Sequence, residues 1–413
     1  MRPNALFLTP RLPFPLVGGD RVKAFHLLKI LSTKYNVTCV SFVEEAPVRH
    51  EWIQKISALG VDLHVIPLKP FAAKLRVARS IFSDKPLEVE YYSHHRFQEK
   101  VNELVGNKKF DIVFAFFMRT AEYARTLTGM PRVLIAEDAR LLTHLRATTA
   151  LNLSPGYFMS LIEREKLSRY EPSIVNDFDL TTFVSPIDRD LLLQFNPTAR
   201  TAIITNGVDL DEFAFNPDQS KRSGIVFAGK MDVRHNVPMA LRIGRELWPQ
   251  LRKQFPTLQC RIVGKNPSAS VRRLRSLGVT VTGEVPHVRD YISSSAVFLH
   301  PQIIGAGIQN KVLEAMALGT PVVTTPVGIA GIRGKHGVHV MIGNSNAELV
   351  DLTARLLASP ALRSELAQNA RELVEADHTW ELVATQLFSA IDLVNGLKSR
   401  PQVIPLIKEI ASA

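Results

Sequence analysis

The feature that most constrains the fold is a repeated alternation of short apolar runs with stretches of helical periodicity. In the first half, apolar runs at residues 5–9, 36–43 and 61–66 alternate with segments whose apolar residues recur at helical spacing. A second series occupies the other half, with apolar runs at residues 224–228 and 260–263. Strands that alternate with helices form parallel sheets whose faces are covered by those helices. We therefore predict an α/β protein with two doubly wound domains that meet at a cleft.

Length and composition agree with this organisation. The 413 residues suit two domains, which we place at residues 1–201 and 202–378. No uncharged apolar run approaches the ~20 residues of a membrane-spanning helix, and prolines at positions 10, 13 and 15 interrupt any signal peptide. Cys39 and Cys260 lie in apolar runs of different halves, as buried thiols of a reducing compartment do. We therefore expect a cytoplasmic protein.

Basic residues outnumber acidic ones in both halves, with 50 Lys and Arg against 39 Asp and Glu and a formal net charge of +11. This balance is compatible with anionic small molecules, an anionic membrane surface or nucleic acid. No aromatic–basic motif accompanies the charge, so we expect no nucleic-acid partner.

Residues 70–83 form a basic amphipathic stretch. Phe71, Leu75 and Phe82 fall on one helical face, and Lys74 and Arg79 lie around it. Such a helix can lie on an anionic membrane surface, or it can pack its apolar face against its own domain. We expect the packed arrangement, with the membrane surface as the alternative.

A glycine loop followed by a helix provides the best candidate for a binding site. Gly305 and Gly307 leave the loop with little side chain, and residues 308–316 follow at helical spacing. A helix N-terminus presents backbone N–H groups at the positive end of the helix dipole, which attracts anions. Lys311 near a phosphate and Glu314 one turn later, accepting from ribose hydroxyls, suit a nucleoside diphosphate. The alternative is an ordinary strand–helix–strand unit with a solvated polar face.

Other candidates also follow predicted strands. Lys230, Gly264 and Gly283 do so in the second half, and Glu137 and Asp138 follow the apolar run at residues 132–136. Open α/β sheets bind ligands at the carboxyl ends of their strands, and a cleft between two Rossmann-like domains is a common place for a site. We therefore expect these residues to line one cleft.

Several motifs together carry a resemblance to a known family. They are the Gly18-Gly19 loop, NGVD at 206–209, FAGK at 227–230, IVG at 262–264, TGEV at 282–285 and KVLEAMALGTPVV at 311–323. Over nearly its whole length the chain resembles the GT-B glycosyltransferases of family 4, which are retaining nucleotide-sugar transferases. It is further similar to bacterial transferases encoded with exopolysaccharide and PEP-CTERM/exosortase systems. The resemblance implies that residues 379–413, which begin a last amphipathic helix, cross back to the first domain.

The resemblance implies roles for the matching positions. Glu314 matches the second glutamate of the E-x7-E motif, which binds the donor ribose, and Lys230 matches a basic residue that contacts the diphosphate. The backbone of Gly307, Ile308 and Gln309 would cradle the diphosphate and sugar. The donor-binding residues expected in this way are Gly19, Lys230, His235, Gly264, Val285, Gly307, Ile308, Gln309 and Glu314, to which we add Lys311 for its charge.

Two positions depart from the family pattern. Ala306 stands where the first glutamate of E-x7-E would contact the donor sugar, and the usual first-domain histidine is absent. Arg119, Glu137 and Asp138 become the candidates for the acceptor side. We expect Lys230, Glu314 and Asp138 to carry the catalytic work.

The sequence also offers groups that could stabilise the leaving diphosphate, either side chains and backbone N–H groups or a bound metal ion. Negative charge grows on the leaving nucleoside diphosphate, and Lys230, Lys311 and the loop N–H groups would meet it. Three D-x-D pairs, at residues 177/179, 188/190 and 209/211, could hold a hard cation. Such pairs also arise by chance in a chain with 39 acidic residues. We expect metal-independent transfer with no cofactor beyond the UDP- or GDP-sugar donor.

We therefore expect a retaining glycosyltransferase of the hexosyltransferase type. Its partners would be a nucleotide sugar and a sugar or lipid-linked acceptor in exopolysaccharide or glycolipid synthesis, with peripheral docking on the inner face of the cell membrane as the alternative for residues 70–83. A nucleotide-sugar epimerase and a catalytically silent partner in a polysaccharide assembly complex are the alternatives. An NAD-dependent oxidoreductase is disfavoured because Gly18-Gly19 lacks the G-x-G-x-x-G spacing.

Overall fold

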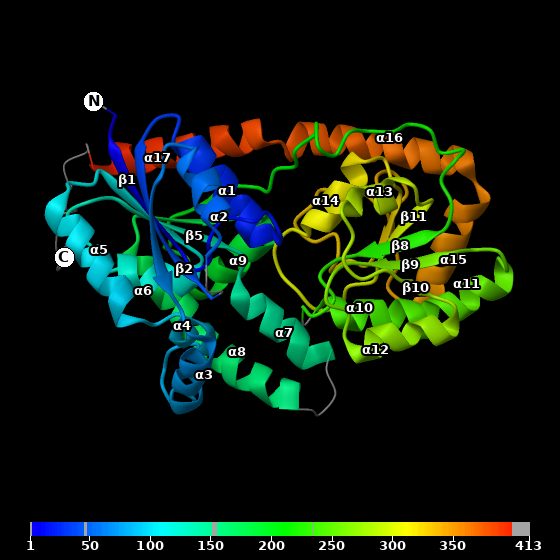
Figure 1. Ribbon diagram of the computed structural model, residues 1–413, viewed down its shortest axis with the longest axis horizontal. Coiled ribbons are helices and arrows are strands. Elements are labelled where there is room, and N and C mark those ends of the chain that lie inside the picture. The colour runs from blue at the N-terminus through cyan, green and yellow to red at the C-terminus, as the bar shows by residue number, and fades with distance from the viewer. Residues whose placement is uncertain (1, 45–47, 151–154, 234, 399–413) are drawn as a thin grey trace, which may run out of the picture.

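The computed structural model describes residues 2–44, 48–150, 155–233 and 235–398 and contains two separate α/β domains (Figure 1). The first domain has a seven-stranded parallel sheet in the order β3-β2-β1-β4-β5-β6-β7. Its strands are β1 (Asn4–Thr9), β2 (Asn36–Val43), β3 (Asp62–Pro67), β4 (Ile112–Phe116), β5 (Arg132–Glu137), β6 (Leu180–Phe183) and β7 (Thr201–Ile203).

Helices cover both faces of this sheet, so its central strands are buried on both sides. Phe7 of β1 pairs in register with Cys39 of β2 and with Phe114 of β4, and all three side chains are buried. The helices of this domain are α1 (Gly19–Leu31), α2 (His50–Ser57), α3 (Pro70–Arg79), α4 (Leu87–Tyr91), α5 (His95–Asn107), α6 (Ala121–Ala124), α7 (Arg140–Ala150), α8 (Pro155–Ile174) and α9 (Pro186–Phe195), with 3-10 turns at Met118–Thr120 and Val175–Asp177.

The second domain repeats this architecture with a six-stranded parallel sheet in the order β10-β9-β8-β11-β12-β13. The prediction of two doubly wound domains is therefore confirmed. The strands are β8 (Ile225–Ala228), β9 (Cys260–Val263), β10 (Thr280–Val281), β11 (Val297–His300), β12 (Val322–Thr324) and β13 (Met341–Ile342). The helices are α10 (Asn236–Arg242), α11 (Trp248–Gln254), α12 (Ala269–Arg272), α13 (Val288–Ser293), α14 (Asn310–Ala317), α15 (Asn346–Ala358) and α16 (Pro360–Asp377), with a π-helical segment at Ile243–Leu247 and a 3-10 turn at Arg273–Leu277.

The last helix returns to the first domain. Helix α17 (Trp380–Lys398) runs along that domain in Figure 1, and its Val383, Leu387 and Ile391 belong to the same core cluster as β1 and α1. Trp380 stacks on His26 of α1, with 3.8 Å between ring centroids and 1° between ring planes. Residues 399–413, the rest of the segment expected to cross back, lie outside the described residues.

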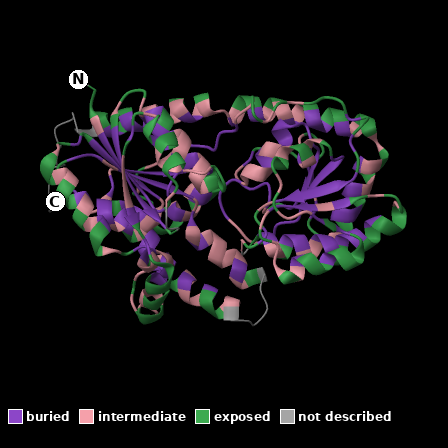
Figure 2. Ribbon diagram, viewed as in Figure 1, coloured by how far each residue is buried: buried purple, intermediate pink, exposed green. Residues whose placement is uncertain are grey.

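Helix α3 differs from the prediction. Of its residues only Ala73 is buried, whereas Phe71 is 82% exposed, Leu75 is 45% exposed and Phe82 in the following turn is 97% exposed. Figure 2 shows the segment as a largely exposed projection of the first domain. The expectation that its apolar face packs on its own domain is wrong, because none of the described elements covers these apolar side chains. Among the described helices, none has the length and apolar character needed to cross a bilayer.

Candidate active site

The glycine loop and α14 form the centre of the candidate site, at the carboxyl end of the second sheet. Gly307 adopts a left-handed conformation with φ of 66°, which a residue with a side chain rarely adopts. The chain then enters α14, whose Val312 and Met316 are buried. Within the described part of the chain, the N–H groups of Ile308 and Gln309 have no hydrogen-bond acceptor. These free donors at a helix N-terminus make an anion site.

Lys311 and Glu314 lie one turn apart on the half-buried side of α14. The Lys311 ammonium donates to Asn236 Oδ1 at 2.5 Å and lies 5.4 Å from the centre of the Phe227 ring. Burial lowers the pKa of Lys311 to about 8, against the opposing effect of Glu314. Burial raises the pKa of Glu314 to about 7, and Lys311 opposes the rise. Partly desolvated charges with pKa values near neutrality are typical of functional sites.

The remaining donor-side residues surround this helix. Lys230 follows β8, is exposed, and lies 3.5 Å from Asp232. The exposed His235 immediately precedes α10. The adjacent Asn236 connects the two lysines, because it accepts from Lys311 and its amide donates to the Lys230 carbonyl at 2.9 Å.

Gly264 and Val285 lie at neighbouring strand ends. A Cβ on Gly264 would lie 1.9 Å from the Gly229 carbonyl oxygen, so only glycine fits there. Val285 follows β10 and packs, half-buried, against the core cluster that contains α14. Both positions therefore lie on the same edge of the second sheet as Lys311 and Glu314.

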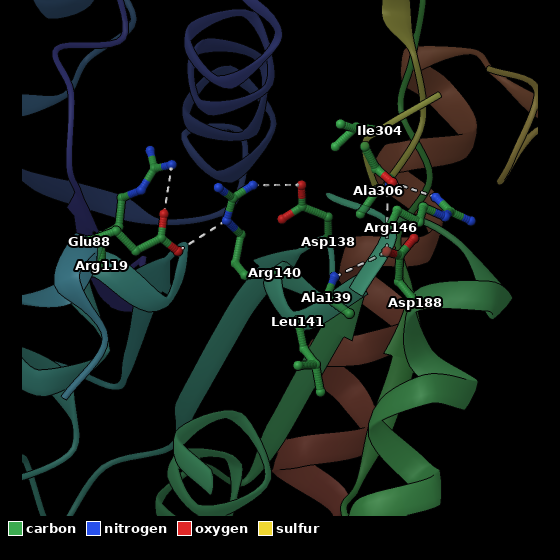
Figure 3. A network of polar contacts seen from close by, with 12 residues as sticks. Glu88, Arg119, Asp138, Ala139, Arg140, Leu141, Arg146, Asp188, Ile304 and Ala306 are labelled. Atoms are coloured by element: carbon green, nitrogen blue, oxygen red, sulfur yellow. Dashed lines mark hydrogen bonds and ion pairs between the residues drawn. The ribbon is translucent and has the colours of Figure 1, made fainter. Parts of the chain in front are cut away.

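The first domain contacts the glycine loop directly (Figure 3). The Asp188 carboxylate accepts from the Gly307 N–H at 3.2 Å and from the Ala139 N–H at 3.1 Å. Arg146 of α7 donates to the Gly305 carbonyl. Burial and the neighbouring Asp138 raise the pKa of Asp188 to about 6. The Gly307 N–H, which the sequence assigned to the diphosphate, is thus bound by a carboxylate of the other domain.

A chain of charged groups lines the first-domain side of the site (Figure 3). Arg119 and Arg140 both contact Glu88, at 3.3 Å and 3.0 Å, and Arg140 also lies 3.4 Å from Asp138 Oδ2. Burial raises the pKa of Glu88, but Arg140 and Arg119 more than offset this and lower it to about 2. Arg119 and Asp138, both predicted for the acceptor side, therefore belong to one network.

Glu137 points into a different network. It is 7% exposed, and Oε1 lies 3.7 Å from the ammonium of the buried Lys23. Lys23 also donates to the Thr205 carbonyl at 2.5 Å and to Asn206 Oδ1 at 3.0 Å. Asn206 in turn donates to Asn310 of α14 at 2.8 Å. Glu137 thus contributes to contacts between the domains, and its acceptor-side role stays a prediction.

Gly19 also approaches α14. A Cβ on Gly19 would lie 2.8 Å from the Asn310 side-chain amide, so the first-domain loop and the N-terminus of α14 are in contact range. The sequence did not point to Lys23 or Arg146, and it indicated Asp188 only as part of a D-x-D pair. The available signals were a lysine on the apolar side of α1 and the S-x-x-D cap at Ser185, whose oxygen accepts from the Asp188 N–H.

The D-x-D carboxylates are engaged by the protein itself. Asp179 accepts from the Arg132 N–H at 2.8 Å, and Asp209 accepts from the N–H groups of Asp211 and Glu212 at 3.1 Å and 2.9 Å. In the ranges that the structure describes, no group of three His, Cys, Asp or Glu side chains is placed to hold a metal ion.

Comparisons with known proteins concern the second domain and the fold as a whole. Residues 222–359 match the family model described as Glycosyl transferases group 1. The chain is 23% identical over 363 residues to TuaC of Bacillus subtilis, a protein named for teichuronic acid biosynthesis glycosyltransferase activity. The match covers 78% of this chain and 88% of that protein.

Solved structures share the two-domain architecture. Sucrose-phosphate synthase from Thermosynechococcus elongatus matches with a TM-score of 0.74 and 18% identity, over 95% of this chain and 100% of that one. The fold is GT-B. HepE of Anabaena, solved in complex with UDP-glucose, matches with a TM-score of 0.64 and 15% identity, over 94% and 99% of the two chains. The matches together support a glycosyltransferase with this fold, as the sequence resemblance implied.

Proposed function

We propose that this protein is a retaining glycosyltransferase of family 4 that uses a UDP- or GDP-sugar in polysaccharide or glycolipid synthesis. The observation that carries the proposal is the N-terminus of α14. Its free N–H groups, Lys311 and Glu314 lie at the edge of the second sheet that faces the first domain. The same residues lie within the span that matches the glycosyltransferase family model.

The chemistry follows from where charge develops. The bond between the anomeric carbon and the donor phosphate oxygen breaks, and the acceptor hydroxyl oxygen bonds to the same face of that carbon. The acceptor proton passes to a donor phosphate oxygen. Lys311, Lys230 and the N–H groups of the loop stabilise the negative charge that grows on the leaving diphosphate. Glu314 holds the ribose, and no metal or further cofactor takes part.

A ligand panel followed by a product assay tests this function. The melting temperature of the protein would be measured with UDP, GDP, UDP-glucose and GDP-mannose. Only the ligands that carry one of the two bases, uracil or guanine, should raise it, because a ligand bound only by the folded state stabilises that state. With the matching donor, free nucleotide should appear on addition of an acceptor, and the product should keep the donor's anomeric configuration. Donor interconversion without an acceptor would indicate an epimerase, and binding without any hydrolysis or transfer would indicate a silent partner.

We further propose that the protein works in the cytoplasm, docked on the inner face of the cell membrane, where a lipid-linked acceptor would be presented. Its docking surface consists of Phe71 and Phe82, which are 82% and 97% exposed, with the exposed Lys74 and Arg79. Helix α8 holds the turn after α3 in place, because Lys166 donates to the Ser80 carbonyl at 2.9 Å. Aromatic side chains beside cations suit an anionic lipid surface.

A further inference from the structure

We propose that Asp138 of the first domain supplies the carboxylate that binds the donor sugar, in place of the glutamate missing from position 306. This inference rests on the proposed function and assigns a specificity-determining residue to the same site. Ala306 is 9% exposed and offers no side-chain acceptor. The hydroxyl groups of a donor hexose need acceptors when they leave water, since an unpaired buried hydroxyl is unfavourable.

Asp138 lies against the loop at the position where such a carboxylate is needed. A Cβ built on Gly307 would lie 3.2 Å from Asp138 Cβ and 3.8 Å from Asp138 Oδ2. Figure 3 shows Asp138 of the first domain near Ala306 of the second, with one Asp138 oxygen directed toward Arg140. Position 306 directly precedes Gly307, so the Asp138 side chain lies beside the loop that carries Ala306.

One oxygen of Asp138 is free to accept. Arg140 contacts Oδ2 at 3.4 Å and so orients the group. Oδ1 is shielded from solvent and has no hydrogen-bond partner among the residues that the structure describes. A shielded carboxylate oxygen without a donor is costly in free energy, and a sugar hydroxyl would supply the missing donor once the carboxylate turns to expose this oxygen.

The neighbouring carboxylates are already engaged. Asp188 accepts from two backbone N–H groups and from the Ser185 hydroxyl. Glu137 is paired with Lys23, and Glu88 contacts two arginines. Asp138 is therefore the carboxylate in this part of the described structure that has an unused oxygen beside the glycine loop.

The difference in affinity between nucleotide sugar and free nucleotide tests this assignment. UDP with UDP-glucose, and GDP with GDP-mannose, would be titrated calorimetrically into wild type and Asp138→Asn, which keeps the shape of the side chain. We expect Asp138→Asn to bind free nucleotide as wild type does but to lose about tenfold or more in affinity for the nucleotide sugar, as for a lost charged hydrogen bond. Asp190→Asn, at an exposed carboxylate of the same domain, is the matched control and should change neither affinity.

A swap of the two positions provides a second test that does not depend on one variant folding well. Ala306→Glu alone should weaken sugar binding, because it places a second carboxylate beside Asp138. Asp138→Ala with Ala306→Glu should recover part of the sugar preference that Asp138→Ala loses.

The outcomes separate this inference from the proposed function. If Asp138→Asn lowers turnover but leaves the ratio of the two affinities unchanged, Asp138 acts on the acceptor and the inference is wrong. If the double variant recovers none of the sugar preference, the inference is also wrong. If wild type binds neither nucleotide, or Glu314→Ala leaves nucleotide affinity unchanged, the proposed function itself fails.

Discussion

At the scale of single residues, the site is defined by charges that are partly removed from water. Lys311 and Glu314 share one side of α14, and burial moves their pKa values to about 8 and about 7. A bound diphosphate would favour the charged form of the Lys311 ammonium. Protonation of Lys311 and binding of the diphosphate should therefore strengthen each other. Nucleotide binding should therefore depend on pH in a range where an exposed lysine would not titrate.

The first prediction concerns this pH dependence. The affinity for the nucleoside diphosphate should fall as pH rises through about 8, because Lys311 then loses its proton in the free protein. Lys311→Ala should bind more weakly at every pH, lose turnover sharply and lack the fall between pH 7 and 9. Calorimetry in buffers of different ionisation enthalpy measures both affinity and proton uptake. Lys253→Ala, at an exposed position on α11, is the control, and an unchanged pH profile in Lys311→Ala would contradict the prediction.

The second prediction concerns Glu171, a buried carboxyl of α8 that accepts from the Leu141 N–H. Burial raises its pKa to about 8 in the folded state, against about 4.3 for an ordinary glutamate. The folded form therefore holds this proton more tightly, and the free energy of unfolding should fall as pH rises from about 4.3 to about 8, by up to about 1.4 kcal/mol per pH unit. Glutamine mimics the protonated acid, so Glu171→Gln should flatten this fall. Urea denaturation at pH 5, 6.5 and 8 measures the free energy of unfolding of both proteins. If it falls with pH equally in wild type and in Glu171→Gln, Glu171 is not the cause of the fall.

At the scale of elements, the strands and helices of the second domain were largely predictable. The strand, glycine loop and helix around α14 follow from apolar periodicity and from the turn at Gly307, which are local properties of the sequence. Contacts between the domains were not predictable in this way. Arg146 and Gly305 are separated by 159 positions, and Asp188 and Gly307 by 119, so no local pattern indicates that they meet.

Helix α3 illustrates the same limit. Its apolar periodicity predicted an amphipathic helix, and the helix is present. Periodicity does not say what covers the apolar side, and in the structure Phe71 and Phe82 remain exposed. The carboxylate missing at position 306 shows the same limit. Its proposed replacement, Asp138, follows a strand far away in the sequence, so no local pattern connects the two positions.

The third prediction uses the glycine loop. Gly307→Ala places a residue with a side chain in a left-handed conformation, which should lower the free energy of unfolding by about 1–2 kcal/mol. The new Cβ would also lie only 3.2 Å from Asp138 Cβ. Gly337→Ala is a matched control, because Gly337 has φ of 75° but nothing within 4 Å of a new Cβ. Denaturation should show a larger loss of stability for Gly307→Ala, and calorimetry should show weaker nucleotide-sugar binding only there. Equal effects of the two substitutions would mean that the loop is not tightly packed against the first domain.

At the scale of the whole molecule, the two domains are joined both at the site and away from it. Asp188 and Arg146 hold the glycine loop, and α17 packs in the core of the first domain. The docking surface defined above belongs to α3 and its following turn. Donor binding and membrane docking would therefore use different elements and should be separable by mutation.

The fourth prediction tests the docking surface. Wild type should float with vesicles that contain phosphatidylglycerol, and less with phosphatidylcholine alone or at high salt, because screening weakens charge attraction. Phe71→Ser with Phe82→Ser, and separately Lys74→Ala with Arg79→Ala, should reduce flotation without changing nucleotide affinity. Arg252→Ala with Lys253→Ala on α11 is the charge-matched control. If all variants float as wild type does, this surface does not bind the membrane and the docking proposal is wrong.

The central claim is that Glu314 and the N-terminus of α14 bind a nucleoside diphosphate. The most direct measurement is calorimetric titration of UDP and GDP into wild type and Glu314→Ala at pH 7.5. We expect wild type to bind one of the two nucleotides and Glu314→Ala to bind it more weakly by about 1–3 kcal/mol, as for the loss of a hydrogen bond to a charged group. Equal affinity in both proteins, with both fully folded, would contradict the claim.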